Sequence, residues 1–236
     1  MNLQYFPVSL PFLLLLSALF ALLLILIQIG VLEYAYARLG IDRRFIFILL
    51  LLSLLGSYVN IPVAVLPGHV HVASQYIEFG GITYSVPVVV GGHGTVIAVN
   101  LGGAVVPTLL SLYLMLKNNL VVRGLIATGI VTAVVHGLAQ PVHGVGIAVP
   151  IFVPPLVSAA VAVLLAWRRA APLAYIGGSL GTLIGADLLN LGRVQELGAP
   201  VASIGGAGTF DGIFLASIFA VLLASLVTPR MRRGRR

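Results

Sequence analysis

The chain has 236 residues, of which 60% are hydrophobic and only 8% charged, and its mean hydropathy is +1.14. Soluble domains contain about 45–50% apolar residues, so a soluble fold of this size could not bury so much apolar surface, and we expect one membrane domain. The net charge of +7 does not indicate nucleic-acid binding, because the basic residues stand at the ends of apolar runs. The absence of cysteine excludes disulfides and thiolate chemistry.

Apolar runs of membrane-spanning length recur along the chain. A helix needs about 20 apolar residues to cross the bilayer core, so a chain of this length holds about seven spans. The first run lacks a basic leader and a cleavage site of small residues, and we therefore keep it as a span. The sequence predicts an all-α polytopic protein of a prokaryotic plasma membrane, with spans near residues 10–31, 45–66, 96–116, 121–138, 147–167, 172–189 and 210–227.

Basic residues set the orientation of these spans. If the spans alternate in direction, every lysine and arginine except Arg193 falls on one side, and such an excess marks the cytoplasmic side. We therefore expect the N-terminus outside and the C-terminus inside. The arginines from Arg230 to Arg236 then lie at anionic lipid headgroups, so the expected partner is the lipid bilayer and not nucleic acid.

A small β-hairpin is predicted on the outer side, between the second and third spans. Runs of β-prone residues at 75–79 and 82–86 flank the pair Gly80-Gly81. A Gly-Gly pair between such runs is typical of a tight hairpin turn. We expect this hairpin, near residues 75–86, to cover the outer face.

Polar side chains on five spans share one depth. Counted at about 1.5 Å per residue from the inner ends, they lie ~22–25 Å up their helices, in the outer third of the bilayer core. They are Asn60, Asn100, His136, Asp187 and Asp211. Ionisable groups inside a membrane are costly and functional by default. Two alternatives stay open: helix tilt could bring the aspartates to the headgroups, and the asparagines could hydrogen-bond between helices.

Glycine-rich backbone surrounds this polar level. Residues 91–94 and 205–209 lead into the third and seventh spans. Non-helical backbone at a membrane is tolerated where it lines a cavity, so these stretches are expected to border a pocket, with plain flexible loops as the alternative. The series Gly177, Gly181 and Gly185 predicts a tight helix contact on one face of the sixth span.

The C-terminal part of the chain resembles two families. Residues 208–214, Gly-Thr-Phe-Asp-Gly-Ile-Phe, resemble the GxGD stretch of the presenilin and signal-peptide-peptidase class of intramembrane aspartyl proteases, with Asp187 in the place of that class's first aspartate. Phe210 stands where that pattern has its second glycine, and no PAL motif follows. Residues 185–215 are also similar to an uncharacterised family of archaeal and bacterial multi-pass proteins, which implies a membrane fold but no activity.

We expect a membrane-embedded hydrolase with its site near the outer face. Two carboxylates that share a site cannot both ionise easily, so one acts as acid while the other activates water. Asp187 and Asp211, on adjacent antiparallel spans, would form such a catalytic pair and act on a membrane peptide. The candidate substrate-binding residues around them are Asn60, Asn100, Asn190 and Gly208.

Two other functions stay open. His136 with Asp187 and Asp211 could bind a divalent metal ion such as zinc, with one position left for water. Interrupted helices and carboxylates inside the membrane also occur in ion- or proton-coupled transporters of small solutes, although no internal repeat is visible. The oligomeric state does not follow from the sequence.

Overall fold

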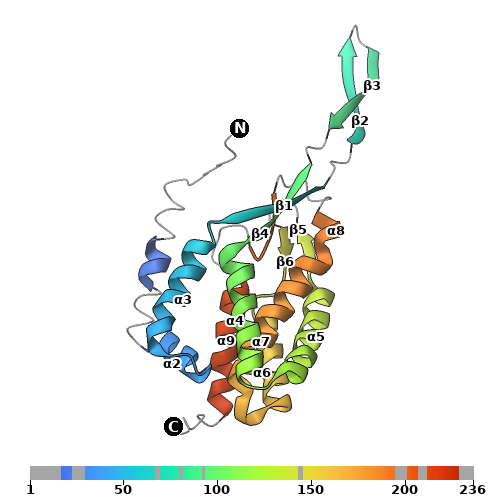
Figure 1. The fold of residues 1–236 in the computed structure, drawn as a ribbon. Coiled ribbons are helices and arrows are strands. Elements are labelled where there is room, and N and C mark those ends of the chain that lie inside the picture. The colour runs from blue at the N-terminus through green and yellow to red at the C-terminus, as the bar shows by residue number, and fades with distance from the viewer. Residues whose placement is uncertain are drawn as a thin grey trace.

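The computed structural model describes residues 17–22, 30–66, 70–79, 82–91, 94–142, 146–194, 201–206 and 212–228. A bundle of helices is covered at one end by a small sheet, from which a long hairpin projects (Figure 1). We call the end with the sheet the outer end and the opposite one the inner end. The turns α2–α3, α4–α5 and α6–α7 and the end of α9 all lie at the inner end, where the sequence places the cytoplasm (Figure 1).

Helix α7 (Ala170–Thr182) is the centre of the bundle and is buried along nearly its whole length. It packs against α4, α5, α6 and α9. The other described helices are α2 (Val31–Arg38), α3 (Arg43–Gly56), α4 (Val106–Lys117), α5 (Val121–Leu138), α6 (Val153–Leu165), α8 (Leu191–Val194) and α9 (Gly212–Val227), with a short 3-10 turn η2 (Trp167–Arg169) before α7.

Close helix contact between α7 and α5 confirms the expected role of the small-residue series. A Cβ on Gly181 would lie 2.6 Å from the Val131 side chain, and one on Gly185 would lie 2.8 Å from the carbonyl oxygen of Thr132. Only a residue without a side chain allows this approach, so the glycines set the distance between the two helices.

Two helical segments of the described chain are long and apolar enough to cross a bilayer: Val121–Leu138 and the continuous run Trp167–Arg193. The mainly helical class is confirmed, but seven full helical spans are not supported. The remaining apolar helices are shorter; they are Arg44–Gly56, Leu101–Lys117, Val153–Leu165 and Gly212–Val227.

Strands replace helix in the outer parts of the spans predicted near 45–66 and 96–116, which corrects both. Helix α3 ends at Gly56 and is followed by β1 (Asn60–Leu66), whereas β4 (Thr95–Asn100) precedes the π-helix η1 (Leu101–Val105) that continues into α4. Both strands are rich in β-branched residues, and Pro62 has no N–H for a helix. Hydropathy alone cannot separate such a strand from a buried helix.

The sheet at the outer end joins three distant parts of the chain in the order β1-β4-β7, where β7 is Val201–Ile204. Strands β1 and β4 are antiparallel, with Asn60 opposite Asn100. Strands β4 and β7 are parallel, with Val99 beside Ile204. The sheet therefore brings the segments that lead into α4 and α9 next to each other.

The predicted outer hairpin is confirmed and is longer than expected. Strands β2 (Val70–Phe79) and β3 (Ile82–Gly91) pair in antiparallel register from Phe79 opposite Ile82 to Val70 opposite Gly91. The hairpin points away from the bundle and does not cover it (Figure 1). A second, short hairpin that the sequence did not predict pairs β5 (Gln140–Val142) with β6 (Gly146–Ala148).

Candidate functional site

Asp187 lies where the backbone winding of the central helix changes. Helix α7 continues as the π-helix η3 (Leu183–Asp187) and then as the 3-10 helix η4 (Leu188–Asn190) before α8. The Asp187 carboxylate is half-buried and its Oδ2 accepts a hydrogen bond of 2.7 Å from the backbone N–H of Gly205. Short π-helical turns inside α-helices are frequent at functional sites. The carboxylate is thus held between the central helix and the end of β7.

Gly205 can make this contact only because it is a glycine. Its φ is +91°, in the region that side chains disfavour, and a Cβ there would lie 2.5 Å from the backbone nitrogen of Ala104. The turn after β7 is therefore fitted tightly between η1 and η3. Part of the glycine-rich stretch expected to border a pocket is a closely packed turn that presents an N–H to Asp187.

Asn190 supports the backbone just before Asp187. Its side chain is fully buried, and its Nδ2 donates to the carbonyl oxygens of Gly185 at 2.9 Å and Ala186 at 3.0 Å. The same nitrogen lies 3.3 Å from Nδ1 of His136. A change from π to 3-10 winding leaves backbone carbonyl groups without their usual helical N–H partners, and this amide donates to two of them instead. That Asn190 binds substrate stays a prediction.

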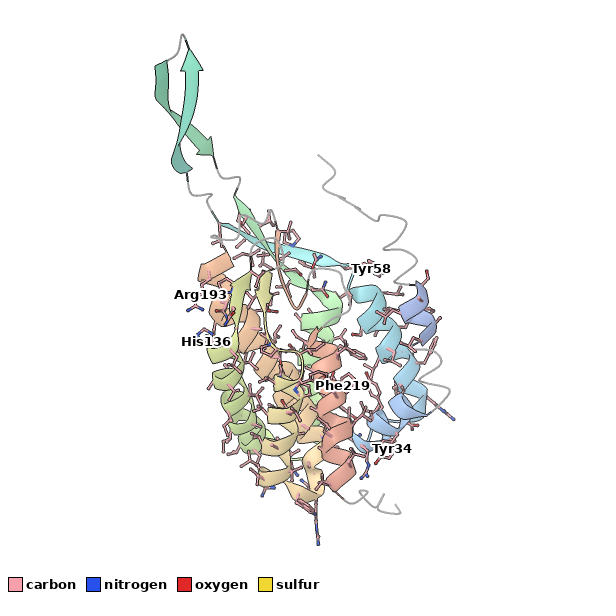
Figure 2. All side chains as sticks on the ribbon, turned by 180° about the vertical axis from the view of Figure 1, so that it is seen from behind. Tyr34, Tyr58, His136, Arg193 and Phe219 are labelled. Atoms are coloured by element: carbon pink, nitrogen blue, oxygen red, sulfur yellow. The ribbon has the colours of Figure 1, made fainter. Side chains whose placement is uncertain are left out.

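His136 and Arg193 meet at this same amide. Asn190 Nδ2 has two protons and three neighbouring acceptor atoms, and its 3.3 Å contact with Nδ1 of His136 is the longest of the three. Arg193 donates to Asn190 Oδ1 at 3.4 Å. Both side chains lie on one flank of the bundle near its outer end, far from Tyr34 at the inner end (Figure 2). The sequence marked Arg193 only as the exception to the charge pattern.

The asparagines Asn60 and Asn100 are joined by hydrogen bonds in the sheet. Asn100 is almost fully buried; its Nδ2 donates to Asn60 Oδ1 at 3.0 Å and to the carbonyl oxygen of Ser57 at 2.7 Å. Its Oδ1 accepts from the N–H of Gly103 at 2.8 Å and so caps η1. Ser203 on β7, which sequence reasoning missed, donates to Asn60 Oδ1 at 2.6 Å. Both asparagines therefore make structural hydrogen bonds, but these join strands and helix ends and not two helices as expected.

The start of α9 and the start of η3 share one apolar cluster. Leu183 of η3 and Ile213 of α9 belong to one buried apolar cluster together with Ile204, the residue before Gly205. Deeper in the bundle, a Cβ on Gly178 would lie 3.1 Å from Cα of Ser217. Helices α7 and α9 are therefore in close contact at the level of Gly178, and Ile213 of α9 and Leu183 of η3 are joined only through this apolar cluster.

A family model matches residues 54–223, under the description "Protein of unknown function (DUF1614)". The chain belongs to this family. The DUF1614 match runs from the end of α3 into α9, so it includes the sheet, Asp187 and the glycine-rich turn. The comparisons with curated proteins and with solved structures found no match.

Some predicted site residues of this DUF1614 chain fall outside the described residues. These are Asp211 and Gly208, together with the loop histidines His69, His93 and His143. Among the residues that the structure describes, no group of three His, Asp or Glu side chains could hold a metal ion. The set of His136, Asp187 and Asp211 includes a residue outside that range, so the metal site stays a prediction.

Proposed function

We propose that this chain is a multi-pass membrane protein that hydrolyses a membrane peptide with the carboxylates of Asp187 and Asp211 at its outer end. The observation that supports it best is the hydrogen bond from Gly205 to Asp187, combined with the packing of Ile204 and Leu183 on Ile213. Ile213 is two residues from Asp211 in the sequence, so this shared cluster supports, as a proposal, the proximity of the two aspartates.

The distribution of side chains supports the membrane part of the proposal. Large apolar residues face outward: Leu164 is 84% exposed, Leu226 80% and Val122 69%. Hydroxyl groups such as those of Ser111 and Ser179 are fully buried inside the bundle. Water would disfavour both features, whereas lipid favours apolar exteriors and hydrogen-bonded polar interiors.

Helix geometry supports the catalytic pair. Helices α7 and α9 run in opposite directions and touch at Gly178 and Ser217. Asp187 follows Gly178 by nine residues, which at about 1.5 Å per residue is ~13 Å towards the outer end. Gly212, the first residue of α9, is ~8 Å above Ser217 by the same count, and Asp211 precedes it. By this count Asp187 and the first residue of α9 differ in height by ~5 Å, about one helical turn, which is compatible with a shared site for Asp187 and Asp211.

The chemistry needs one ionised and one protonated carboxyl group. The carboxylate removes a proton from water while the water oxygen bonds to the carbonyl carbon, and the carboxyl group gives its proton to the carbonyl oxygen. The resulting gem-diol loses its C–N bond; the nitrogen leaves as an amine after taking up a proton, and a carboxylic acid remains. The bond from Gly205 holds Oδ2 of Asp187 in place and leaves Oδ1 for the water.

Proximity of the two aspartates can be tested by cross-linking, because the natural chain has no cysteine. We expect the double variant Asp187→Cys/Asp211→Cys to react with a short bifunctional thiosulfonate to give an internally cross-linked chain, detected by mass spectrometry. The control pair Asp42→Cys/Asp211→Cys should not react in this way, because Asp42 begins α3 at the inner end. No cross-link in the first pair, with both thiols reactive, would contradict a shared site.

Catalytic competence needs a separate measurement. A peptide isostere with a hydroxyethylene group resembles the tetrahedral intermediate, and enzymes bind such analogues far more tightly than substrates. A photoreactive form should label the natural protein, and Asp187→Asn or Asp211→Asn should reduce labelling by about tenfold or more. Asp42→Asn is the matched control. Equal labelling of all four proteins would exclude the aspartyl mechanism.

A further inference from the structure

Two hydroxyl groups are buried beneath Asp187 without a hydrogen-bond partner in the described part of the chain. They are Oγ of Ser158 on α6 and Oγ1 of Thr182, the last residue of α7. Ser158 is 1% exposed and Thr182 is 7% exposed. Buried hydroxyl groups are nearly always paired with protein or with ordered water, because an unpaired one keeps the full cost of its desolvation.

The two hydroxyl groups and Asp187 follow one another along the central helix. A Cβ on Gly178 would lie 3.5 Å from Ser158 Oγ, so Ser158 faces α7 at the level of Gly178. Thr182 is four residues further, on the same face and one turn closer to the outer end. Asp187 is five residues beyond Thr182, across the π-helical turn of η3, in which residues five apart are aligned.

The residues next in line below Ser158 and Gly178 on their own helices are apolar. One turn further towards the inner end, Ala162 on α6 and Ala174 on α7 are both 0% exposed and belong to the main apolar core. Ser217 of α9, which also faces Gly178, donates its hydroxyl proton to the carbonyl oxygen of Phe214 at 2.9 Å. Three other buried hydroxyl groups also lack a partner in the described residues, those of Tyr58, Thr128 and Ser225. Ser158 and Thr182 are distinguished from them by their line along α7 towards Asp187.

We propose that Ser158 and Thr182 bind water beneath Asp187, and that this bound water supplies the hydrolytic reaction. A buried water typically makes about three hydrogen bonds. Ser158 lies at the level of Gly178, ~13 Å below Asp187, so the site requires a short chain of waters and not a single one. The two hydroxyl groups provide partners along this chain and Oδ1 of Asp187 provides one at its outer end, since Oδ2 is occupied by Gly205. The binding of water follows from the unpaired hydroxyl groups alone, whereas its use in hydrolysis rests on the proposed function.

Cysteine accessibility tests the water site without any assay of activity. In the cysteine-free chain, Ser158→Cys and Thr182→Cys should react with aqueous silver ion at least about tenfold faster than Ala162→Cys and Ala174→Cys, because only the first pair lies where water is held. These controls are on the same two helices, one turn from Ser158 and from Gly178. Equal rates at all four positions would overturn the proposal.

Replacement by isosteric apolar residues gives a second, independent result. If Thr182 hydrogen-bonds to water, Thr182→Val lowers the thermal midpoint by several degrees, whereas Thr182→Ser, which keeps the hydroxyl group, changes it less. If the hydroxyl group truly has no partner, Thr182→Val raises the midpoint, and the water site is excluded. The same comparison applies to Ser158→Ala.

The outcomes separate this proposal from the catalytic one. Reactive cysteines at 158 and 182 without a cross-link between positions 187 and 211 would retain the water site and remove the catalytic pair. A cross-link with unreactive cysteines at 158 and 182 would do the reverse. If the cysteines at 158 and 182 react and the cross-link between 187 and 211 forms, a third result is expected. Thr182→Val should still be labelled by the photoreactive isostere but should hydrolyse its substrate more slowly, which assigns the bound water to the reaction.

Discussion

The inner and outer parts of the central helix differ in their winding and in what surrounds them. From Ala170 to Thr182 the helix is regular, buried and packed mainly by apolar side chains and small residues. From Leu183 to Asn190 it is first a π-helix and then a 3-10 helix, and its polar side chains bond to backbone groups of the helix and of the turn after β7. The central helix thus changes from regular α-helical winding to π and 3-10 winding at Leu183.

We attribute this difference in winding to buried side-chain amides that hydrogen-bond to the helix backbone. Each described π-helix has a buried asparagine bonded to its backbone: Asn100 accepts from an N–H inside η1, and Asn190 donates to two carbonyl oxygens of η3. An amide that competes for backbone groups stabilises windings that a regular helix would not adopt. In the inner part the side-chain donors to the α7 backbone are hydroxyl groups, from Ser179 to Tyr175 and from Thr132 to Gly181, and the helix stays regular.

The largest expected effect on stability comes from the outer end of the bundle, at Gly102 of η1. A Cβ there would lie 2.0 Å from the carbonyl oxygen of Ser53 and 2.4 Å from the nitrogen of Ser57, both in the backbone of α3 and its end. We expect Gly102→Ala to lower the free energy of unfolding by about 3 kcal/mol or more, measured by denaturant titration in detergent.

The matched control is Gly129→Ala on α5, where a Cβ would meet no atom within 4 Å. This change should leave stability unaltered or raise it by up to about 1 kcal/mol, because alanine favours helix over glycine. Equal losses at positions 102 and 129 would show that the outer end is not fixed by the close backbone contact.

A smaller effect is expected when the amide of Asn190 is removed. Asn190→Leu keeps a similar volume but leaves the carbonyl oxygens of Gly185 and Ala186 without this donor, which should cost about 2 kcal/mol. The loss should be local. Hydrogen exchange of the amides in residues 183–190 should accelerate, while exchange in residues 170–182 stays unchanged. Acceleration along the whole of α7 would contradict a separate outer part.

Some of this architecture follows from sequence and some does not. The two long apolar helices, the hairpin, the segregation of basic residues at one end and the tight contact on the glycine face of residues 177–185 were predictable, because each depends on local composition or spacing. That α5 is the partner in this contact was not. The sheet was not. Its strands are short and apolar, and pairing between residues as distant as Val96 and Val201 leaves no local pattern.

The candidate site was likewise predictable only in part. Asp187 and His136 were found because ionisable residues are conspicuous in apolar spans. The supporting contacts were missed, since the N–H of Gly205 and the hydroxyl of Ser203 reach their partners only after the sheet has formed. The glycine-rich pattern around Gly205 was the one available indication, and it did not specify which N–H would meet which carboxylate.

The smallest expected effect belongs to the regular part of α7, at its hydrogen bond to α4. Ser179 Oγ donates to the carbonyl oxygen of Tyr175 at 2.7 Å, so the proton in the 2.7 Å contact between Ser111 and Ser179 comes from Ser111. Ser111→Ala removes one donor and leaves Ser179 paired, which should cost about 1 kcal/mol or less. Ser179→Ala should cost more, because it leaves the buried hydroxyl of Ser111 without its acceptor. The measurement is thermal unfolding of both serine variants in parallel with Asn190→Leu. If Ser111→Ala lost as much stability as Asn190→Leu, polar contacts would stabilise both parts of α7 equally. The change of winding at Leu183 would then have another cause.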